Sequence, residues 1–339
     1  MINWGLGYSA SYHATLVDPI TMEDIGYGDE ASFDITGGSI SRTDTDLRQS
    51  ADISTVDIEL ERESWIRVYM IATQGVEKQR IPIFTGLAIT PSKNVNGRRT
   101  EISIQCYSVL KPLQDILLPK GWFVDTGVSC TNIIRQLTDP ISNIVTIAPT
   151  DAMFDDYIIA ENNETYLSML DAVLTSMNWR IRIDGYGRVS IGPYANEPAQ
   201  IFDGRSNDVL EPQVKIDNDW YGCPNVLRVT TNYDEYIEYD YSDSIYSIPS
   251  RGRQVWAEES NCNLTNGESL EFYAKRRLKE LQDFAVKVSY QRSYDPAVFP
   301  TDVVRINYPE YDISGVFYVT SQTVTLGYGS ATQEEVIQL

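Results

Sequence analysis

Trp65-Ile66-Arg67-Val68-Tyr69 and Val303-Val304-Arg305-Ile306-Asn307 share a pattern of apolar and polar residues, although they lie far apart in a chain of 339 residues. The pattern has the period of a β-strand with one buried face. Each stretch is also the second of four such runs. The first series consists of Val56–Leu60, Trp65–Tyr69, Ile83–Leu87 and Thr100–Ile104, and the second of Val286–Tyr290, Val303–Asn307, Val316–Val319 and Glu334–Ile337.

The two series predict that the β unit of residues 51–107 returns at residues 283–339. The order of the runs repeats, although few identities do. Any two antiparallel β segments share this alternation, so an internal duplication and a chance likeness both remain open from the residues alone. Residues between the two units have a different, partly helical pattern.

The charge balance is strongly acidic, with 27 basic and 48 acidic residues and a formal net charge of −21. A protein that grips nucleic acid needs clustered Lys and Arg to displace counterions from phosphate, so we expect no specific DNA binding. An acidic surface repels polyanions and would suit a conduit that DNA slides through, although plain solubility explains the charge as well.

Length and hydropathy set the remaining bounds. A chain of 339 residues is long enough for two or three domains. No run reaches the roughly 20 apolar residues of a membrane-spanning helix, and the first residues lack the pattern of a secretory signal. We therefore expect no membrane anchor.

Catalytic, cofactor and metal sites find little support. The single histidine, His13, has no nucleophile nearby in sequence and is more typical of a surface or packing residue. The acidic stretch 233–246 lacks the Gly and Glu of a calcium loop and predicts an exposed strand or hairpin instead. The cysteines are too widely spaced for a zinc site and indicate reduced, partly buried thiols; they are Cys106, Cys130, Cys223 and Cys262. We predict no enzyme activity, no catalytic, cofactor-binding or metal-binding residues and no cofactor.

Residues 1–110 are predicted to form a first β domain, with strands over 7–17, 31–36 and 52–60. Asn96-Gly97 predicts a tight hairpin, because both residues accept positive φ cheaply. Residues 111–199 are predicted to form a small α/β insert domain. Its expected elements are a short helix capped by Ser129 and stopped by Pro140, a longer helix after residues 162–164, and a hairpin at Asp184-Gly185-Tyr186-Gly187.

Residues 200–339 are predicted to form a second β domain with a packed helix at about 266–284 and a peripheral acidic β segment at about 231–260. Thr265 and Glu268 have the spacing of a capping box, and the helix is expected to pack across a β sandwich. Its basic residues predict a solvated face or a contact with acidic neighbours or an adjoining subunit; they are Lys275, Arg276, Arg277 and Lys279.

In the order of its elements the chain resembles the baseplate hub proteins of phage tails, which are similar to the central hub of contractile tails and occur also in defective prophages and R-type bacteriocins. The residues that carry the resemblance are Gly37-Gly38-Ser39-Ile40 with Asp46-Leu47-Arg48, the run Phe84–Thr90 before the Asn-Gly hairpin, Met177-Asn178-Trp179 before the Asp-Gly hairpin, and Gly315-Val316-Phe317-Tyr318-Val319.

The resemblance implies a mainly β fold with an α/β insert, in which two tail-tube-like β-sandwich or barrel domains accompany a small α+β domain. It also implies a homotrimer whose six tube-like domains surround a channel. Such a ring would meet a hexameric tail tube protein, a trimeric spike and surrounding baseplate proteins, within a virion or a phage-tail-like particle made in the bacterial cytoplasm. DNA would pass through without being specifically bound, and no catalytic residue carries over.

A carbohydrate-binding or receptor-binding adhesin of the tail tip is the alternative, because the acidic, β-rich chain holds 22 Tyr and 6 Trp. The sequence leaves several points open: a contractile or non-contractile tail, a virion or a bacteriocin, the residues of the channel and of the ring interface, and whether the trimer forms without partners.

Overall fold

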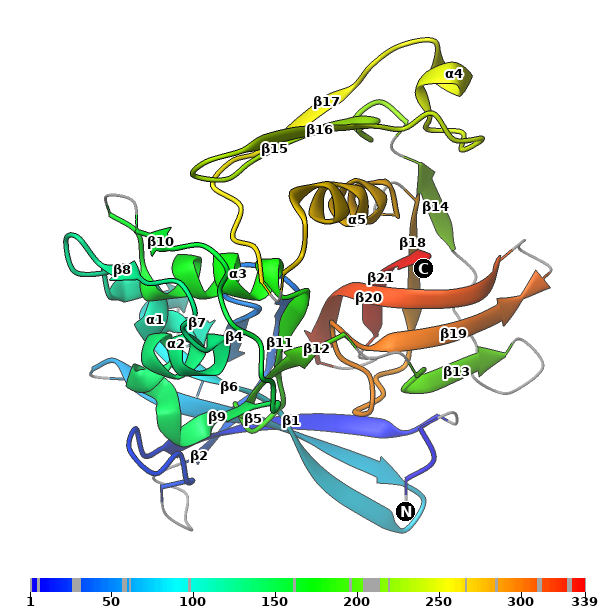
Figure 1. Ribbon diagram of the computed structural model, residues 1–339. Coiled ribbons are helices and arrows are strands. Elements are labelled where there is room, and N and C mark those ends of the chain that lie inside the picture. The colour runs from blue at the N-terminus through cyan, green and yellow to red at the C-terminus, as the bar shows by residue number, and fades with distance from the viewer. Residues whose placement is uncertain are drawn as a thin grey trace.

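The structure is a computed structural model, and it describes residues 2–4, 7–25, 32–56, 60, 62–96, 99–160, 163–194, 197–203, 214–218, 220–265, 267–283, 286–309, 313–327 and 331–338. Over these residues the chain is mainly β. A sheet of 13 strands runs through the molecule, a group of helices lies beside one part of it, and a small separate sheet lies at the top of the view (Figure 1).

The first part of the large sheet comes from the N-terminal third of the chain. Its strands are β1 (Ser9–Val17), β2 (Ser32–Ile35), β3 (Gly37–Thr43), β4 (Gln49–Thr55), β5 (Ser64–Gln74), β6 (Glu77–Asn96) and β7 (Arg99–Ser108). They lie in the order β3-β4-β7-β6-β5-β1-β2, and each neighbour is antiparallel. Alternate residues of β4 are buried, and Ile53 is completely inaccessible to solvent, as the period of two requires.

The second part comes from the C-terminal third. Its strands are β13 (Gln200–Asp203), β14 (Lys215–Asn218), β18 (Val286–Arg292), β19 (Val303–Tyr308), β20 (Ile313–Leu326) and β21 (Thr332–Gln338). They lie in the order β14-β18-β21-β20-β19-β13, and all pairs are antiparallel except β13 with β19.

The two parts share one strand order. The series β3-β4-β7-β6-β5-β1 matches β14-β18-β21-β20-β19-β13 strand for strand, with only the last pair differing in direction. β6 is irregular against β7 between Ala88 and Thr90, and β20 is irregular against β21 between Val319 and Ser321. A bulge at the same place in matching strands is a specific feature of a fold. We therefore name residues 9–108 and 200–338 the first and the second β unit.

The bulges also fix which residues match. Leu87 precedes Ala88 and pairs with Trp65, while Tyr318 precedes Val319 and pairs with Val303. Trp65 therefore aligns with Val303, as the two series of runs predict. That the units superpose as one fold, and that the boundaries near residues 110 and 200 delimit domains, stay predictions.

The two units are joined edge to edge, which the sequence did not indicate. The first half of β20 pairs with β19, and its second half pairs with β3 of the first unit, from Ser321 opposite Thr43 to Leu326 opposite Gly38. We call this strand pairing the internal joint. Because of it, the two β units form one continuous sheet.

The insert between the units contains α1 (Lys111–Asp115), β8 (Phe123–Val124), α2 (Cys130–Leu137), the 3₁₀ helix η2 (Asp139–Ile144), β9 (Val145–Ile147), β10 (Ile158–Ile159), α3 (Tyr166–Ser176), β11 (Trp179–Ile183) and β12 (Val189–Pro193). Its helices and strands share a hydrophobic core that includes Ile134, Leu170 and Ile181. The hydroxyl of Thr165 caps α3 by accepting a hydrogen bond from the Ser168 amide at 3.1 Å. Ser129 precedes α2 as expected, but its side chain makes no capping hydrogen bond.

The small separate sheet is formed by β15 (Val226–Thr230), β16 (Glu235–Tyr239) and β17 (Trp256–Glu259), with α4 (Ile248–Arg251) in the connection. The acidic stretch 233–246, expected to form an exposed strand or hairpin, contributes one strand, β16, which pairs antiparallel with β15 and is mostly half-buried. The helix α5 (Leu270–Asp283) buries Tyr273, Ala274 and Leu278 in one core with Leu227 and Val229 of β15.

Several local predictions differ from the structure. The first strand of the first series is β4, which ends at Thr55 rather than running through residues 56–60, of which 57–59 lie outside the described residues. The helix packs on the small sheet rather than across a sandwich. Its predicted capping box is wrong, because α5 begins at Leu270 and the Ser269 hydroxyl accepts from the Phe272 amide at 3.2 Å. β6 and β7 form the predicted hairpin up to Asn96 opposite Arg99, while Gly97 itself lies outside the described residues.

Candidate functional site

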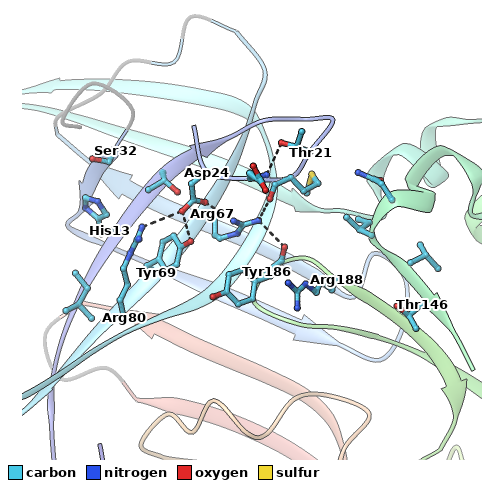
Figure 2. Close-up of a pocket in the computed structure, with 17 residues that line it drawn as sticks. His13, Thr21, Asp24, Ser32, Arg67, Tyr69, Arg80, Thr146, Tyr186 and Arg188 are labelled. Atoms are coloured by element: carbon cyan, nitrogen blue, oxygen red, sulfur yellow. Dashed lines mark hydrogen bonds and ion pairs between the residues drawn. The ribbon is translucent and has the colours of Figure 1, made fainter. Parts of the chain in front are cut away.

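A cavity of about 1150 Å³ lies between the first β unit and the insert. Strands β1, β5 and β6 form one wall, the loop of residues 21–24 another, and η2, β9 and the β11–β12 turn the third. Figure 2 shows Asp24 in the middle of this cavity, with Arg67, Tyr69 and Arg80 pointing toward it.

The Asp24 carboxylate is held by several donors. Arg67 Nη1 lies 2.7 Å from Oδ1, the Tyr69 hydroxyl donates to Oδ2 at 2.6 Å, and Arg80 Nη2 lies 3.7 Å from Oδ2. Burial and the hydrogen bond to Asp24 raise the pKa of Tyr69 to about 12. The phenol is therefore neutral at physiological pH and acts as a donor to the carboxylate.

Arg67 connects three segments of the chain. Its guanidinium donates to Thr85 Oγ1 at 2.9 Å, to the Met22 carbonyl at 2.7 Å and to the Tyr186 carbonyl at 3.3 Å. Thr85 in turn donates to the Gly185 carbonyl at 2.8 Å. Because Arg67 is only 4% exposed and each of its three guanidinium nitrogens donates a hydrogen bond, its role is to fasten the insert to the first unit.

The β11–β12 turn fits closely against the first unit at Gly185. A Cβ atom at that position would lie 1.9 Å from the Pro82 carbonyl oxygen, so only glycine permits this approach. Further ties complete the attachment of the insert. Arg48 Nη2 lies 2.5 Å from Asp171 Oδ1 in α3, and Arg182 Nε lies 3.0 Å from Asp302 Oδ1 of the second unit.

His13, which lines the cavity, pairs with a carboxylate on the neighbouring strand. His13 Nδ1 lies 3.1 Å from Asp34 Oδ1, but the Asp34 side chain is 78% exposed and the pair lies at the rim, on β1 and β2. The Asp24 carboxylate is paired with the side chains of Arg67 and Arg80. The polar contacts of this lining hold separate segments of the chain together.

A second buried polar cluster crosses the internal joint. Arg292 of β18 contacts Glu334 of β21 at 2.6 Å and 2.8 Å, and Gln322 of β20 donates to Glu334 at 2.6 Å. Arg42 of β3 donates to Gln322 Oε1 and to the Ile83 carbonyl. We call these four side chains the joint network. The pKa of Arg292 is raised, because the attraction of Glu334 outweighs the burial that opposes its charge.

The joint network fastens the two units to each other. Arg42 and Gln322 are 1% and 0% exposed, so their polar atoms depend on partners within the chain for hydrogen bonding. The Arg42 guanidinium also lies over the rings of Tyr294 and Phe299, at 5.6 Å and 4.8 Å from their centroids. None of these residues was singled out by the sequence, because the signal depends on a pairing between strands far apart in the chain.

The basic residues of α5 find acidic partners within the chain. Arg277 Nη2 lies 2.7 Å from Glu259 Oε1, Arg276 Nε lies 3.3 Å from Glu268 Oε1, and Lys275 Nζ lies 2.5 Å from Glu271 Oε1. The predicted contact with acidic neighbours is therefore present for these three within the chain itself.

The acidic side chains, thiols and helices bear on metal and membrane binding. Within the described residues, no three His, Cys, Asp or Glu side chains lie close enough to hold a metal ion. All four cysteines are buried thiols, and burial raises the pKa of Cys130 to about 11. No helix in the described part of the chain is long and apolar enough to cross a membrane.

Solved structures similar to this one include tail proteins of phages and prophages. A tail protein from Neisseria meningitidis superposes with a TM-score of 0.71 at 15% identity, over 98% of this chain and 97% of that one. The 43 kDa tail protein of prophage MuSo2 from Shewanella oneidensis gives a TM-score of 0.69 at 13% identity, over 98% of both chains. No family model and no curated protein matches the sequence.

A component of the type VI secretion system of Escherichia coli, described as similar to the phage T4 tail proteins gp27 and gp5, gives a TM-score of 0.55 at 8% identity. It covers 91% of this chain and 74% of that one. At such identities the likeness concerns the fold, and that fold is shared along nearly the whole chain. The chain thus has the fold of phage tail proteins, with two β units of one strand order and an α/β insert between them.

Proposed function

We propose that three copies of this protein form the hub ring of a phage tail or phage-tail-like baseplate. The observation that carries the proposal is the repeated strand order, together with the internal joint between the two units. A head-to-tail contact that is repeated around an axis closes a ring when the rotation angle between neighbouring units is a whole-number fraction of 360°. Two similar units per chain, related by roughly 60°, would supply six near-equivalent positions from three chains.

Such a ring serves as a symmetry adaptor. Six similar units match a hexameric tail tube protein on one side, while the true threefold symmetry matches a trimeric spike on the other. The insert and the small sheet would face surrounding baseplate proteins. This division of roles gives the duplication a physical reason, since one chain type then meets partners of both symmetries without a further protein between them.

In this role the protein keeps a channel open and catalyses no reaction. A permanent ring buries more than roughly 2,000 Å² in total, mostly through strand and side-chain contacts. The net charge of −21 supports a channel lined in part by carboxylates, past which DNA moves without sticking. The fastened lining of the cavity beside Arg67 supports a non-enzymatic role as well.

Mass measurement of the purified chain, alone and mixed with its tube and spike partners, tests the proposal. A species of three chains supports it, and DNA passing without retention at physiological salt supports the open acidic channel. A chain that remains monomeric in every mixture would overturn the ring.

A tail-tip adhesin is the second candidate, and the small sheet favours it. Trp256 and Tyr241 are 47% and 66% exposed, and Tyr239 stacks with Tyr241 at 6.1 Å between ring centroids. Exposed aromatic faces of this kind can stack on sugar rings. Binding to a glycan array by the intact chain, lost in Trp256→Ala and retained in Tyr186→Ala, would support this function. Tyr186 is a suitable control because it is 42% exposed and lies on the insert.

A further inference from the structure

We propose that the ring closes through a strand pairing between chains, in which the second half of β6 of one copy adds to β14 of the next copy. This inference rests on the trimeric ring proposed above and names its interface. The occupant is a second copy of this chain, and the template for the contact is the internal joint within each copy.

In the internal joint, β20 has neighbouring strands on both of its sides. β21 pairs with β20 along its length on one side, and on the other side β19 covers the first half and β3 covers the second half. β6 has the counterparts of two of these three neighbours. β7 lies along one side, and β5 covers the first half of the other side, from Glu77 to Ala88. Among the described residues, no strand covers the second half of β6 opposite β7.

The matching strand on the other unit is also at an edge. β3 has β4 on one side and β20 on the other. β14, the counterpart of β3, has β18 on one side and ends the strand order of the described sheet. Sheet edges of this kind are templates for strand addition, so each copy offers both halves of one missing joint.

The register of the missing joint follows from the matching strands. Counting from the bulge, Val95 of β6 corresponds to Leu326 of β20. Through β4 and β18, which pair in matching positions with β7 and β21, Ile216 of β14 corresponds to Ile40 of β3. In the internal joint Leu326 lies opposite Gly38, two positions from Ile40. Val95 would therefore lie opposite Val214 of the next copy.

Exposure supports this register independently of strand order. Leu326 and Ile40 are 2% and 0% exposed within the internal joint. Their counterparts Val95 and Ile216 are 62% and 46% exposed, although both are apolar. Side chains on the same face of neighbouring strands bury one another when the strands pair. The proposed pairing would cover these two residues as the internal joint covers theirs.

The two edges lie on different sides of the molecule. β14 lies at the upper right of the view, whereas β6 runs from the lower right to the left, below the helices of the insert (Figure 1). One edge cannot pair with the other within a chain in this arrangement, and a head-to-tail contact uses each edge once. Three internal joints and three joints between chains would then alternate around the ring.

A disulfide between Val95→Cys and Val214→Cys tests the register. Residues directly opposite in an antiparallel pair have Cα atoms about 4.5–5.5 Å apart, which a disulfide spans. The double variant should give a covalent trimer after mild oxidation, and a mixture of the two single variants should give a covalent dimer. The native thiols are buried and should not interfere. Val76→Cys combined with Val214→Cys is the matched control, because Val76 is fully exposed but lies at the β5–β6 turn.

The outcomes separate this inference from the proposed function. A trimer by mass that forms no Val95–Val214 disulfide would overturn this interface while the ring stands. A covalent dimer of the Val95→Cys single variant alone would also overturn it, because it requires a two-fold contact. Absence of a trimer in all mixtures with tube and spike would overturn both.

Charged substitutions give a second measurement. Val95→Glu or Ile216→Glu should raise the concentration at which the trimer dissociates by about tenfold or more, because each places a charge in the apolar face of the joint. Both side chains are exposed in the single chain, so the melting temperature of the monomer should change little. Val76→Glu should leave the trimer intact. Equal dissociation of wild type and both edge variants would overturn the inference.

Discussion

Ile40 and Ile216 occupy matching positions in the two β units, yet Ile40 is completely buried and Ile216 is 46% exposed. The difference arises because β20 covers β3, while β14 ends the described sheet. Within one chain, therefore, one of two matching joints is formed. The predictions below concern the joint that is formed, the attachment of the insert, and finally the assembly.

Removing Glu334 should strongly destabilise the chain. Its carboxylate contacts Arg292 and Gln322 in the joint network and is 1% exposed. Glu334→Ala leaves the buried Arg292 without its anion, which costs about 3–5 kcal/mol in comparable cases. Urea unfolding should show this loss, and the double variant Arg292→Met with Glu334→Leu should recover most of it. A double variant as unstable as Glu334→Ala would contradict an electrostatic origin.

Arg67→Ala should loosen the insert from the first unit. Loss of hydrogen bonds to Asp24, Met22 and Tyr186 leaves buried acceptors unsatisfied, at a cost of roughly 3 kcal/mol or more. The control is Arg80→Ala, because the Arg80 side chain is 46% exposed and such ion pairs contribute less than about 1 kcal/mol. Hydrogen exchange should show faster opening of the β11–β12 turn only in the Arg67 variant. Equal protection in both variants would exclude the fastening role.

Gly185→Ala should destabilise by several kcal/mol or prevent folding. The added Cβ meets the Pro82 carbonyl oxygen at 1.9 Å, and backbone on both sides must move to admit it. Gly7→Ala is a matched control, since no atom lies within 4 Å of its Cβ position. Thermal melting of both variants tests the point, and a Gly185 variant that melts with the wild type would show that the close approach is not required.

Alkaline pH should act on the cavity through Tyr69. Its pKa is about 12 in the folded chain and about 10 when unfolded. Stability from the neutral phenol is fully present below pH 10 and is lost as the pH rises through 12. Tyr69→Phe, which lacks this phenol, should be less stable than wild type at pH 8, and the gap should narrow between pH 10 and 12. Unfolding midpoints across that range provide the measurement, and a constant gap would rule the titration out.

Much of the β architecture could be predicted from alternation alone. The runs from Trp65 and from Val303 lie in matching strands, because a buried face imposes a period of two wherever the strand lies. The hairpin at Asp184-Gly185 was equally visible, since turn chemistry is local. Strand pairing was not visible, because the contact of β20 with β3 depends on residues far apart in the chain.

For the candidate functional residues, too, local sequence patterns could be read, whereas contacts between distant residues could not. The sequence offers His13 no nucleophile nearby, and the expectation that it has no catalytic role stays a prediction. Arg42, Arg67 and Glu334 could not be singled out among the charged residues. Their importance comes from burial and from the partner that the fold supplies, and neither is recorded in local sequence.

Imaging of the protein assembled with its tube and spike partners tests the central claim most directly. The account predicts a threefold ring of three chains with six tube-like β units on the side that faces the tube, and continuous β-sheet between chains where β6 meets β14. A globular monomer, or a ring whose chains show no sixfold arrangement of units, would contradict it.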